Sequence, residues 1–243
     1  MMNAKNILKI VSHNAFWFQG SSFTGEKPGE PSKEVLERLI EIYSLLNPDV
    51  LCLQEVQSRK VAEDISEKLN MKWFYAPGVL FREYGGAIFL KRYINVLDYQ
   101  YSRENITRMW QKLKIKLASG ETLVLCNIHL PSGRLLGEKS STYRLHDLEQ
   151  VFIKGEYPDI IVGDFNEPPW GLVYEYMLAK EYTDIAMGEE PTILRGLRVD
   201  YIWVRKKVLK TVLDYFVYKN MLLTEKNIFL SDHYPIVAVI ALE

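Results

Sequence analysis

The sequence predicts an α/β sandwich, in which two sheets of mixed, mostly antiparallel strands pack face to face with helices on their outer sides. Short apolar runs typical of strands recur from residue 7 to residue 242. Helical periodicity separates some of them, mainly in the first half, and a hairpin follows in the middle of the chain. Polar residues fall at the ends of the runs, at positions that only strands of both directions can bring together.

Composition and length indicate one globular domain spanning residues 1–243. Hydrophobic residues make up 48% and charged residues 25% of the chain, which is ordinary for a protein that buries a single core. The 30 basic and 31 acidic residues give a formal net charge of −1. Since the molecule has no overall basic field, binding of a phosphate or a nucleic acid must depend on a local group of charges or on a metal ion.

The chain has no segment that predicts export or membrane insertion. Its first residues lack the long apolar stretch of a signal peptide, and no segment offers the roughly 20 uninterrupted apolar residues of a membrane span. Cys52 and Cys126 each lie in an apolar run, where a free thiol packs as a small core residue. We therefore expect reduced cysteines and a cytoplasmic location, and take the chain to be a monomer.

Nine runs have the composition of strands. They cover residues 7–13, 49–54, 85–90, 108–117, 121–130, 159–164, 199–204, 211–218 and 235–242. Helices are predicted at residues 32–46, 58–69, 142–152 and 171–180. Residues 118–121 are predicted to join two strands as a hairpin, and the Gly-, Pro- and Ser-rich segment 18–32 is predicted to be a surface loop.

Six groups of polar residues mark the ends of these runs. Four groups follow a run: Asn14, Glu55, His129, and Asp164 with Asn166. Two groups precede a run: Asp200, and Asp232 with His233. All six share one rim only if the last two strands run opposite to the first four. A TIM barrel, whose parallel strands place the site at their carboxyl ends, predicts the wrong position for Asp200, Asp232 and His233, so the sandwich is preferred.

The composition of this rim predicts a magnesium or manganese site. Carboxylates and amide carbonyls dominate it, and no Cys-x-x-Cys or His-x-x-x-His pattern supports zinc. Hard oxygen ligands suit Mg²⁺, which is usually held by one or two carboxylates together with substrate phosphates. So many acidic groups beside a phosphate require a cation. Asp200 can pair with His233, which then serves either as a general base or as a positive donor to a phosphoryl oxygen.

Seven short motifs, taken in order, resemble the endonuclease/exonuclease/phosphatase superfamily with its DNase I-like fold. They are Asn14, Gln54-Glu55, "GGAIF" at 85–89, "NIHL" at 127–130, "GDFN" at 163–166, "RVDYI" at 198–202 and "SDHYP" at 231–235. The resemblance extends over nearly the whole chain. It implies a four-layer α/β sandwich and Mg²⁺-dependent hydrolysis of a phosphodiester bond, with Mn²⁺ as an alternative ion.

The resemblance also implies a role for each matching residue. Glu55 resembles the principal metal ligand, with Asn14 close to the metal and Asp232 as a further ligand. Asp164 resembles the group that orients or deprotonates the attacking water, and Asn166 resembles a phosphate-binding amide. His233 with Asp200 resembles the His-Asp pair that faces the phosphoryl group.

The motifs do not assign a branch of the superfamily. His129 resembles the extra histidine of the deoxyribonuclease, sphingomyelinase and deadenylase branches, and abasic-site endonucleases typically lack it. Tyr84, just before "GGAIF", instead matches a tyrosine that abasic-site enzymes also have. The two signals conflict, so the branch stays open.

Three residues outside these motifs, Tyr84, Arg134 and Trp170, are predicted to bind substrate. Phe16, Trp17 and Phe18 either stack on bases or sugars or simply pack in the core. The leading hypothesis is a phosphodiesterase for DNA, RNA or a nucleotide-like substrate. The alternative is an enzyme for a small-molecule or lipid head-group phosphate, which the near-neutral charge favours. A catalytically silent binding protein is disfavoured, because Glu55, Asp164 and His233 are all present.

Overall fold

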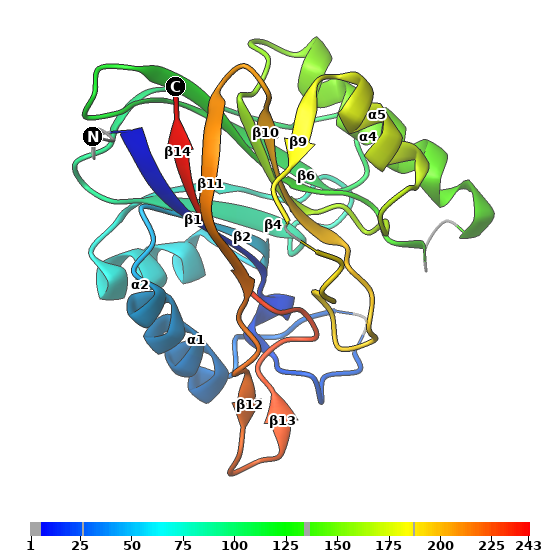
Figure 1. Ribbon diagram of the computed structural model, residues 1–243. Coiled ribbons are helices and arrows are strands. Elements are labelled where there is room, and N and C mark those ends of the chain that lie inside the picture. The colour runs from blue at the N-terminus through cyan, green and yellow to red at the C-terminus, as the bar shows by residue number, and fades with distance from the viewer. Residues whose placement is uncertain (1–5, 26, 134–136, 187) are drawn as a thin grey trace.

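Two six-stranded sheets pack face to face in the computed structural model, which describes residues 6–25, 27–133, 137–186 and 188–243 (Figure 1). The first sheet has the order β11 (Leu209–Val217), β14 (Ile236–Leu242), β1 (Ile7–Asn14), β2 (Val50–Val56), β4 (Gly85–Leu90), β3 (Lys72–Ala76). The second has the order β5 (Asn95–Tyr101), β6 (Met109–Lys116), β7 (Thr122–His129), β8 (Ile160–Asp164), β10 (Asp200–Arg205), β9 (Tyr182–Asp184).

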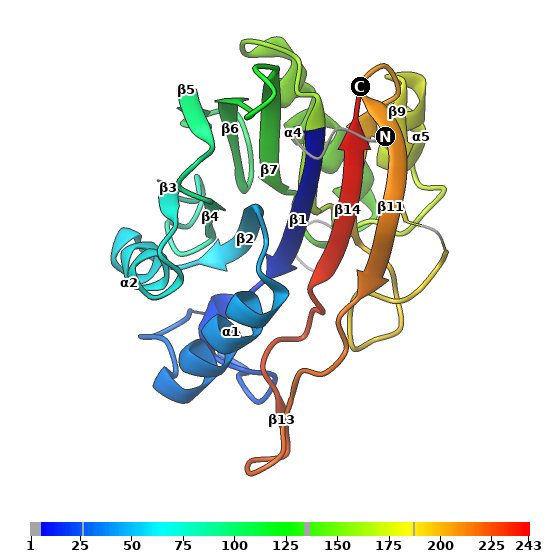
Figure 2. The same ribbon diagram turned by 60° about the vertical axis from the view of Figure 1, so that its left-hand side comes forward.

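Helices cover the outer face of each sheet, which gives the four layers that the sequence predicts. α1 (Lys33–Leu46) and α2 (Arg59–Leu69) lie against the first sheet, and α4 (Ser140–Ile153) and α5 (Leu172–Ala179) lie against the second (Figures 1 and 2). Side-chain alternation builds these layers, because successive residues of a strand point to opposite faces. In β2, Cys52 packs between the sheets, while Leu51 and Leu53 pack under α1 and α2.

Strand directions meet the condition that one common rim requires. β1 pairs in parallel with β2, and β7 pairs in parallel with β8. β14 runs antiparallel to β1, and β10 runs antiparallel to β8. The starts of the late strands therefore lie at the same edge as the ends of the early ones. The other strand pairs within the two sheets are antiparallel, so the sheets are mixed and mostly antiparallel, as predicted.

The predicted helices and the hairpin are confirmed, whereas several peripheral strands are additional. The helices agree with prediction to within two residues at each end, and β6 pairs with β7 across the turn at Gly120. β3, β5 and β9 are edge strands of the sheets, where half-exposed residues give a weak apolar signal. β12 (Leu222–Leu223) and β13 (Ile228–Phe229) form a small hairpin that projects beyond the sandwich (Figure 2).

Both cysteines are free and buried. In the part of the chain that the structure describes, none of the helices combines the length and the apolar character needed to cross a membrane.

Candidate active site

Strand register brings the predicted site residues together at the rim. His129 pairs with Asp164 across the parallel strands β7 and β8, and Asp164 pairs with Asp200 across the antiparallel strands β8 and β10. Asn14, at the end of β1 in the other sheet, donates from Nδ2 to Asp164 Oδ2 at 3.0 Å. Residues from both sheets therefore converge on one carboxylate, as the sequence predicts.

Glu55 enters the site through a β-bulge. Gln54 pairs with Gly86 and Val56 with Gly85, so Glu55 is the extra residue in β2, and its φ is +54°. A bulge re-aims a side chain and is common beside active sites. Gly85 accommodates it, because a Cβ at that position would lie 2.7 Å from the carbonyl oxygen of Ala76 and 2.8 Å from that of Val56. The glycines of "GGAIF" thus leave room for the bulge that presents Glu55.

The "GDFN" segment positions Asp164 through a glycine that lets two neighbouring strands approach closely. Gly163 has φ +142°, and a Cβ there would lie 1.9 Å from the carbonyl oxygen of Ile128 on the neighbouring strand. Asn166 has φ +51°, and its side chain donates to Leu130 O at 2.9 Å. Non-glycine residues with such φ values cost about 1–3 kcal/mol each and cluster at functional sites.

Asp164 is the most heavily hydrogen-bonded carboxylate of the rim. Besides Asn14, it accepts from the backbone N–H of Asn166 at 2.8 Å and from the Asn166 side chain at 3.1 Å. Burial raises the pKa of Asp164 to about 6, although His233 and these donors oppose the increase. A carboxylate whose pKa lies near neutrality suits proton transfer at physiological pH.

His233 and Asp200 form the predicted pair. His233 Nδ1 lies 2.9 Å from Asp200 Oδ2, and its Nε2 lies 3.7 Å from Asp164 Oδ2. Burial disfavours the imidazolium, but Asp200 and Asp164 outweigh it and hold the pKa of His233 well above its ordinary value. The ring therefore carries a proton that Nε2 can offer toward the rim. The Ser231 hydroxyl secures this geometry by donating to Asn14 O and accepting from His233 N.

His129 lies on the side of Asp164 opposite to the His233-Asp200 pair, and its imidazole is uncharged. Its Nε2 is 3.5 Å from Asp164 Oδ2 and 3.9 Å from Glu55 Oε1. Burial, and then the nearby charge of Arg108, lowers the pKa of His129 well below its ordinary value. A neutral imidazole there can donate to or accept from a substrate without adding charge.

The oxygen atoms near Glu55 fit a divalent metal ion. Glu55 Oε2 and Asp232 Oδ1 are buried and have no hydrogen-bond partner among the described residues. Burial raises the pKa of Glu55 to about 8, while Arg108 opposes the increase. Unpartnered buried carboxylate oxygens are costly unless a cation binds them, and oxygen ligands are those that Mg²⁺ prefers.

A second group of metal-ligand type lies deeper. Ligand atoms of Asp164, Asp200 and His233 all lie within 4.8 Å of one another, and all three residues are buried. In this group Asp200 already binds His233, and Asp164 accepts several hydrogen bonds. An ion in this group would have to displace these bonds, whereas Glu55 Oε2 has no hydrogen-bond partner among the described residues.

Arg108 is a site residue that the sequence analysis missed. Its guanidinium is buried and stacks 3.6 Å above the ring of Tyr84, and its Nη1 lies 3.9 Å from Glu55 Oε1. Its Nε and Nη1 have no hydrogen-bond partner in the described chain. The hairpin register could have revealed it, because Arg108 immediately precedes Met109, the partner of His129.

Comparison with known proteins agrees with this geometry. The model of the endonuclease/exonuclease/phosphatase family matches residues 11–233. The chain belongs to this family. Its members hydrolyse phosphoester bonds and generally use divalent metals, so the chain is a phosphoesterase by family. No curated protein matches the chain closely enough to count as a relative.

Solved structures with this endonuclease/exonuclease/phosphatase fold superimpose over nearly the whole chain. A functionally unknown conserved protein from Enterococcus faecalis V583 has 19% identity and a TM-score of 0.76, and covers 97% of this chain and 100% of its own. The human Nocturnin catalytic domain has 19% identity and a TM-score of 0.74, with 100% and 96% covered. A D. rerio TDP2 humanized by 14 mutations has 19% identity and a TM-score of 0.72, with 97% and 99% covered.

A cavity of ≈ 880 Å³ opens over the family's motif residues. Asn14, Glu55, His129, Asp164, Asn166, Asp232 and His233 all line it, as does Tyr84. Asp200 is fully buried behind His233. Trp170 is not among the lining residues and is 69% exposed, packing on Tyr174, and Arg134 lies outside the described residues. A role for these last two stays a prediction.

Two arginines that could have added charge to the mouth are already paired. Arg144 is buried and bonds Glu167 Oε2 at 2.7 Å, and Arg198 bonds Asp184 Oδ2 at 2.7 Å. Both pairs brace the loops behind the family's site, and only Arg144 also reaches the cavity wall.

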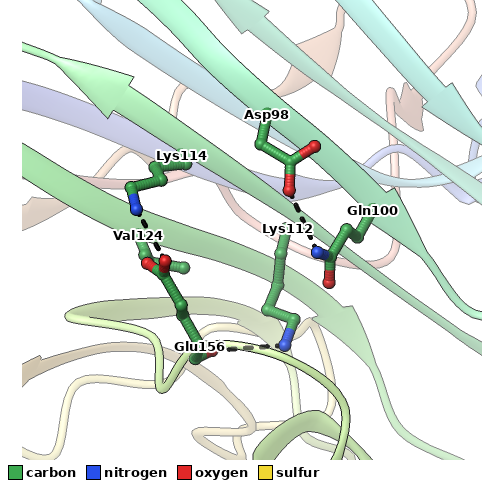
Figure 3. A pocket seen from close by; sticks show the side chains of 6 residues that line it. All are labelled: Asp98, Gln100, Lys112, Lys114, Val124 and Glu156. Carbon is green, nitrogen blue, oxygen red and sulfur yellow. Dashed lines mark hydrogen bonds and ion pairs between the residues drawn. The ribbon is translucent and has the colours of Figure 1, made fainter.

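A smaller pocket of ≈ 40 Å³ lies away from the rim (Figure 3). There the Lys112 ammonium donates to carbonyl oxygens of Val151, Lys154 and Glu156 at and after the end of α4, and Lys114 pairs with the Glu156 side chain. Because both ammonium groups are bonded within the protein, we interpret this pocket as a structural contact that joins β6 to the end of α4.

Proposed function

We propose that this protein is a Mg²⁺-dependent phosphodiesterase that cleaves a nucleic acid or a nucleotide-like substrate, with Mn²⁺ able to replace Mg²⁺. One observation carries the proposal: a buried glutamate with an unpartnered oxygen lies beside a histidine-aspartate pair and a second, hydrogen-bonded aspartate. That combination offers a cation position, a proton donor and a water-binding carboxylate within one cavity. We further propose that residues 1–243 act as one domain, because both sheets supply the site.

Glu55, Asn14 and Asp232 would hold the metal ion, which supplies Lewis acidity toward the phosphoryl group when bound. The protein's own groups do the rest. Asp164, with its pKa near neutrality, orients the attacking water and accepts its proton. His233 presents its Nε2 proton to a phosphoryl oxygen, and Asp200 fixes the ring and maintains its charge.

Further donors surround the position that the phosphoryl group would take. Asn166, His129 and Arg108 line the same cavity. They can donate to the non-bridging oxygens, on which charge accumulates during phosphoryl transfer. Because Arg108 lacks partners for Nε and Nη1 within the described residues, it is the strongest additional anion ligand.

A substitution at Glu55 tests this proposal. Glu55→Gln keeps the shape of the side chain but removes the charge, so we expect turnover to fall by about two orders of magnitude or more. The variant should also lose the rise in unfolding temperature that Mg²⁺ gives the parent protein. Glu37→Gln, on the exposed face of α1, is the matched control and should retain both properties. Full activity in chelator, or an unchanged response of Glu55→Gln to Mg²⁺, would contradict the proposal.

A second candidate function is hydrolysis of a small-molecule or lipid head-group phosphate. The observation that favours it is the mixed charge of the cavity wall, where Glu55, Glu83, Asp164 and Asp232 oppose Lys27, Arg108, Arg144, Arg195 and the protonated His233 among the described lining residues. Single- and double-stranded DNA, RNA, inositol phosphates and sphingomyelin, each assayed with Mg²⁺, Mn²⁺ and chelator, distinguish the candidates. Turnover confined to inositol phosphates or sphingomyelin would establish the second.

A further inference from the structure

A strained turn of three aromatic residues lies beside the site. Phe16, Trp17 and Phe18 have φ values of +47°, +50° and +56°. The turn is closed by Phe18 N–H donating to Ala15 O at 2.9 Å, and it is tied to the site by Phe16 N–H donating to Asn14 Oδ1 at 3.0 Å. Left-handed backbone is easy for glycine and rare for aromatic residues. Three aromatic residues in succession therefore indicate that their rings are needed where this turn places them.

The turn begins a continuous aromatic wall along the cavity, consisting of Phe16, Trp17, Phe23, Phe81 and Tyr84. Trp17 is buried and holds the wall, because its Nε1 donates to Glu83 O at 2.9 Å and its ring meets Tyr84 edge-to-face at 4.8 Å. Phe16 meets Phe23 at 6.0 Å. At the other end, Tyr84 lies 6.3 Å from His129, measured between ring centroids. The wall thus runs from the loop after β1 to the catalytic rim.

The wall has exposed faces available to a ligand. Trp17 is only 5% exposed and the Tyr84 ring is covered by Arg108, whereas Phe81 is 45% exposed and Phe16 and Phe23 are half-buried. Half-exposed rings that are fixed from behind form a stacking surface, and stacking on planar bases is favourable for every base type.

The charges around the cavity argue against a duplex as the occupant. Of the four described lysine and arginine residues in its lining, Arg144 is bonded to Glu167, and Arg108 is buried beside Glu55, where it and His233 face only the reacting phosphate. Lys27 and Arg195 are the two exposed cations that remain in the described lining. Binding to duplex DNA depends on many phosphate contacts made by Lys and Arg. A ligand with few phosphates, held chiefly by ring stacking, matches this cavity better.

We propose that the aromatic wall stacks an unpaired nucleobase of the substrate beside the phosphate that is cleaved. This inference rests on the proposed phosphodiesterase activity and narrows it to nucleotides and unpaired strand ends. Both sources share one recognition chemistry, a planar base linked through its sugar to the reacting phosphate. The base supplies the stacking energy, while the rim residues bind the phosphate.

Two matched substrate pairs test the inference. The first comparison uses a single-stranded dinucleotide and two base-free variants of it. In each variant a tetrahydrofuran residue replaces the nucleoside at one of the two positions. We expect the base-free form to have a KM higher by roughly 10-fold or more at one of these positions. The second pair is a short single strand and its blunt duplex, of which the single strand should be cleaved faster. The dinucleotide and a longer single strand, compared as substrates, then tell the two sources apart.

Substitutions in the wall provide the complementary readout. Phe16→Leu and Phe23→Leu remove a ring and keep an apolar side chain, and Phe23 lies outside the strained turn. Either change should raise KM for the dinucleotide by roughly 10-fold and leave KM for the base-free form unaltered. Tyr143→Leu, on the exposed side of α4, is the matched control.

Binding of the dinucleotide to the Glu55→Gln protein, followed by tryptophan fluorescence, gives a measurement that does not require turnover. Weaker binding after Phe23→Leu in that background is expected. Equal KM values for normal and base-free dinucleotides, or a preference for the duplex or for a lipid phosphodiester, would overturn this inference and leave the phosphodiesterase proposal intact. Absence of hydrolysis of every phosphodiester would instead overturn the proposed function.

Discussion

Gly163 connects the stability of the second sheet to the geometry of the site, so Gly163→Ala is an informative perturbation. The added Cβ would lie 1.9 Å from the carbonyl oxygen of Ile128, whereas ordinary van der Waals contact begins at 3.4 Å. Strands β7 and β8 must therefore separate by roughly 1.5 Å at this point or Gly163 must change its backbone angles. The next pair in register is His129 with Asp164, so the displacement directly reaches the carboxylate that we propose orients the attacking water.

The energetic cost can be assembled from its parts. An L-residue at φ +142° costs about 1–3 kcal/mol, and weakening two ladder hydrogen bonds at about 1 kcal/mol each adds about 2 kcal/mol. We therefore expect Gly163→Ala to lower the free energy of unfolding by about 3–5 kcal/mol. Turnover should fall by roughly 100-fold, because a misplacement of about 1 Å has that effect on a positioned catalytic group.

Urea unfolding and steady-state kinetics measure the two effects separately. Gly29→Ala is the matched control, because a Cβ at Gly29 would meet no atom within 4 Å, and its free energy of unfolding should stay within about 0.5 kcal/mol of the parent value. A Gly163→Ala protein as stable and as active as Gly29→Ala would refute the argument that the close approach of the two strands positions Asp164.

Three further predictions follow from charges. Arg108→Gln should raise KM for a phosphodiester by roughly 10-fold and tighten Mg²⁺ binding, measured by calorimetry, because a cation near Glu55 is lost. Asp200→Asn should lower the pKa of His233, seen in its NMR titration, and shift the alkaline limb of the pH–rate profile to lower pH. Burial raises the pKa of Asp147 from 3.8 to about 6, so the folded protein retains a proton that the unfolded chain releases. The unfolding free energy of the parent, relative to Asp147→Asn, should therefore fall by about 2 kcal/mol as the pH rises from 4 to 6 in urea titrations. A pH-independent difference would contradict this.

The sequence was sufficient for those parts of the fold that depend on local patterns. Central strands such as β2 and β8 are buried along their whole length and are apolar up to the rim, so the polar residues at their ends stand out against that background. The requirement that Asp200 and His233 meet Asp164 then determined the strand directions, since side chains at opposite ends of a sheet cannot share a cavity. The relative directions of distant strands were thus inferred from the need to bring the site residues together, and not from the strand propensities of the residues.

The sequence was not sufficient where conformation depends on a distant partner. The bulge at Glu55 exists because β4 offers Gly85 beside it, and no residue next to Glu55 signals it. The hairpin register places Arg108 near His129, but the orientation of its guanidinium depends on Tyr84, which lies 24 positions away in the chain. The left-handed turn at Phe16 likewise has no local glycine to announce it.

Two buried glutamate-arginine pairs differ in how fully they are hydrogen-bonded within the protein. Arg144 lies 2.7 Å from Glu167 and also donates to Pro131 O, so both partners are satisfied by the fold. Arg108 and Glu55 remain 3.9 Å apart, each with buried polar atoms that lack partners among the described residues. Stacking on Tyr84 at 3.6 Å holds the guanidinium in place without hydrogen bonding it to the carboxylate.

This separation has a functional consequence. At 3.9 Å the positive charge of Arg108 still favours the ionised form of Glu55, yet the Glu55 oxygen stays open to a cation and the guanidinium stays open to an anion. A closer, fully hydrogen-bonded pair would be more stable and would have neither site to offer. The cost of leaving these atoms unpaired in the free protein is recovered when a metal ion and a phosphate bind together, so the two ligands should bind cooperatively.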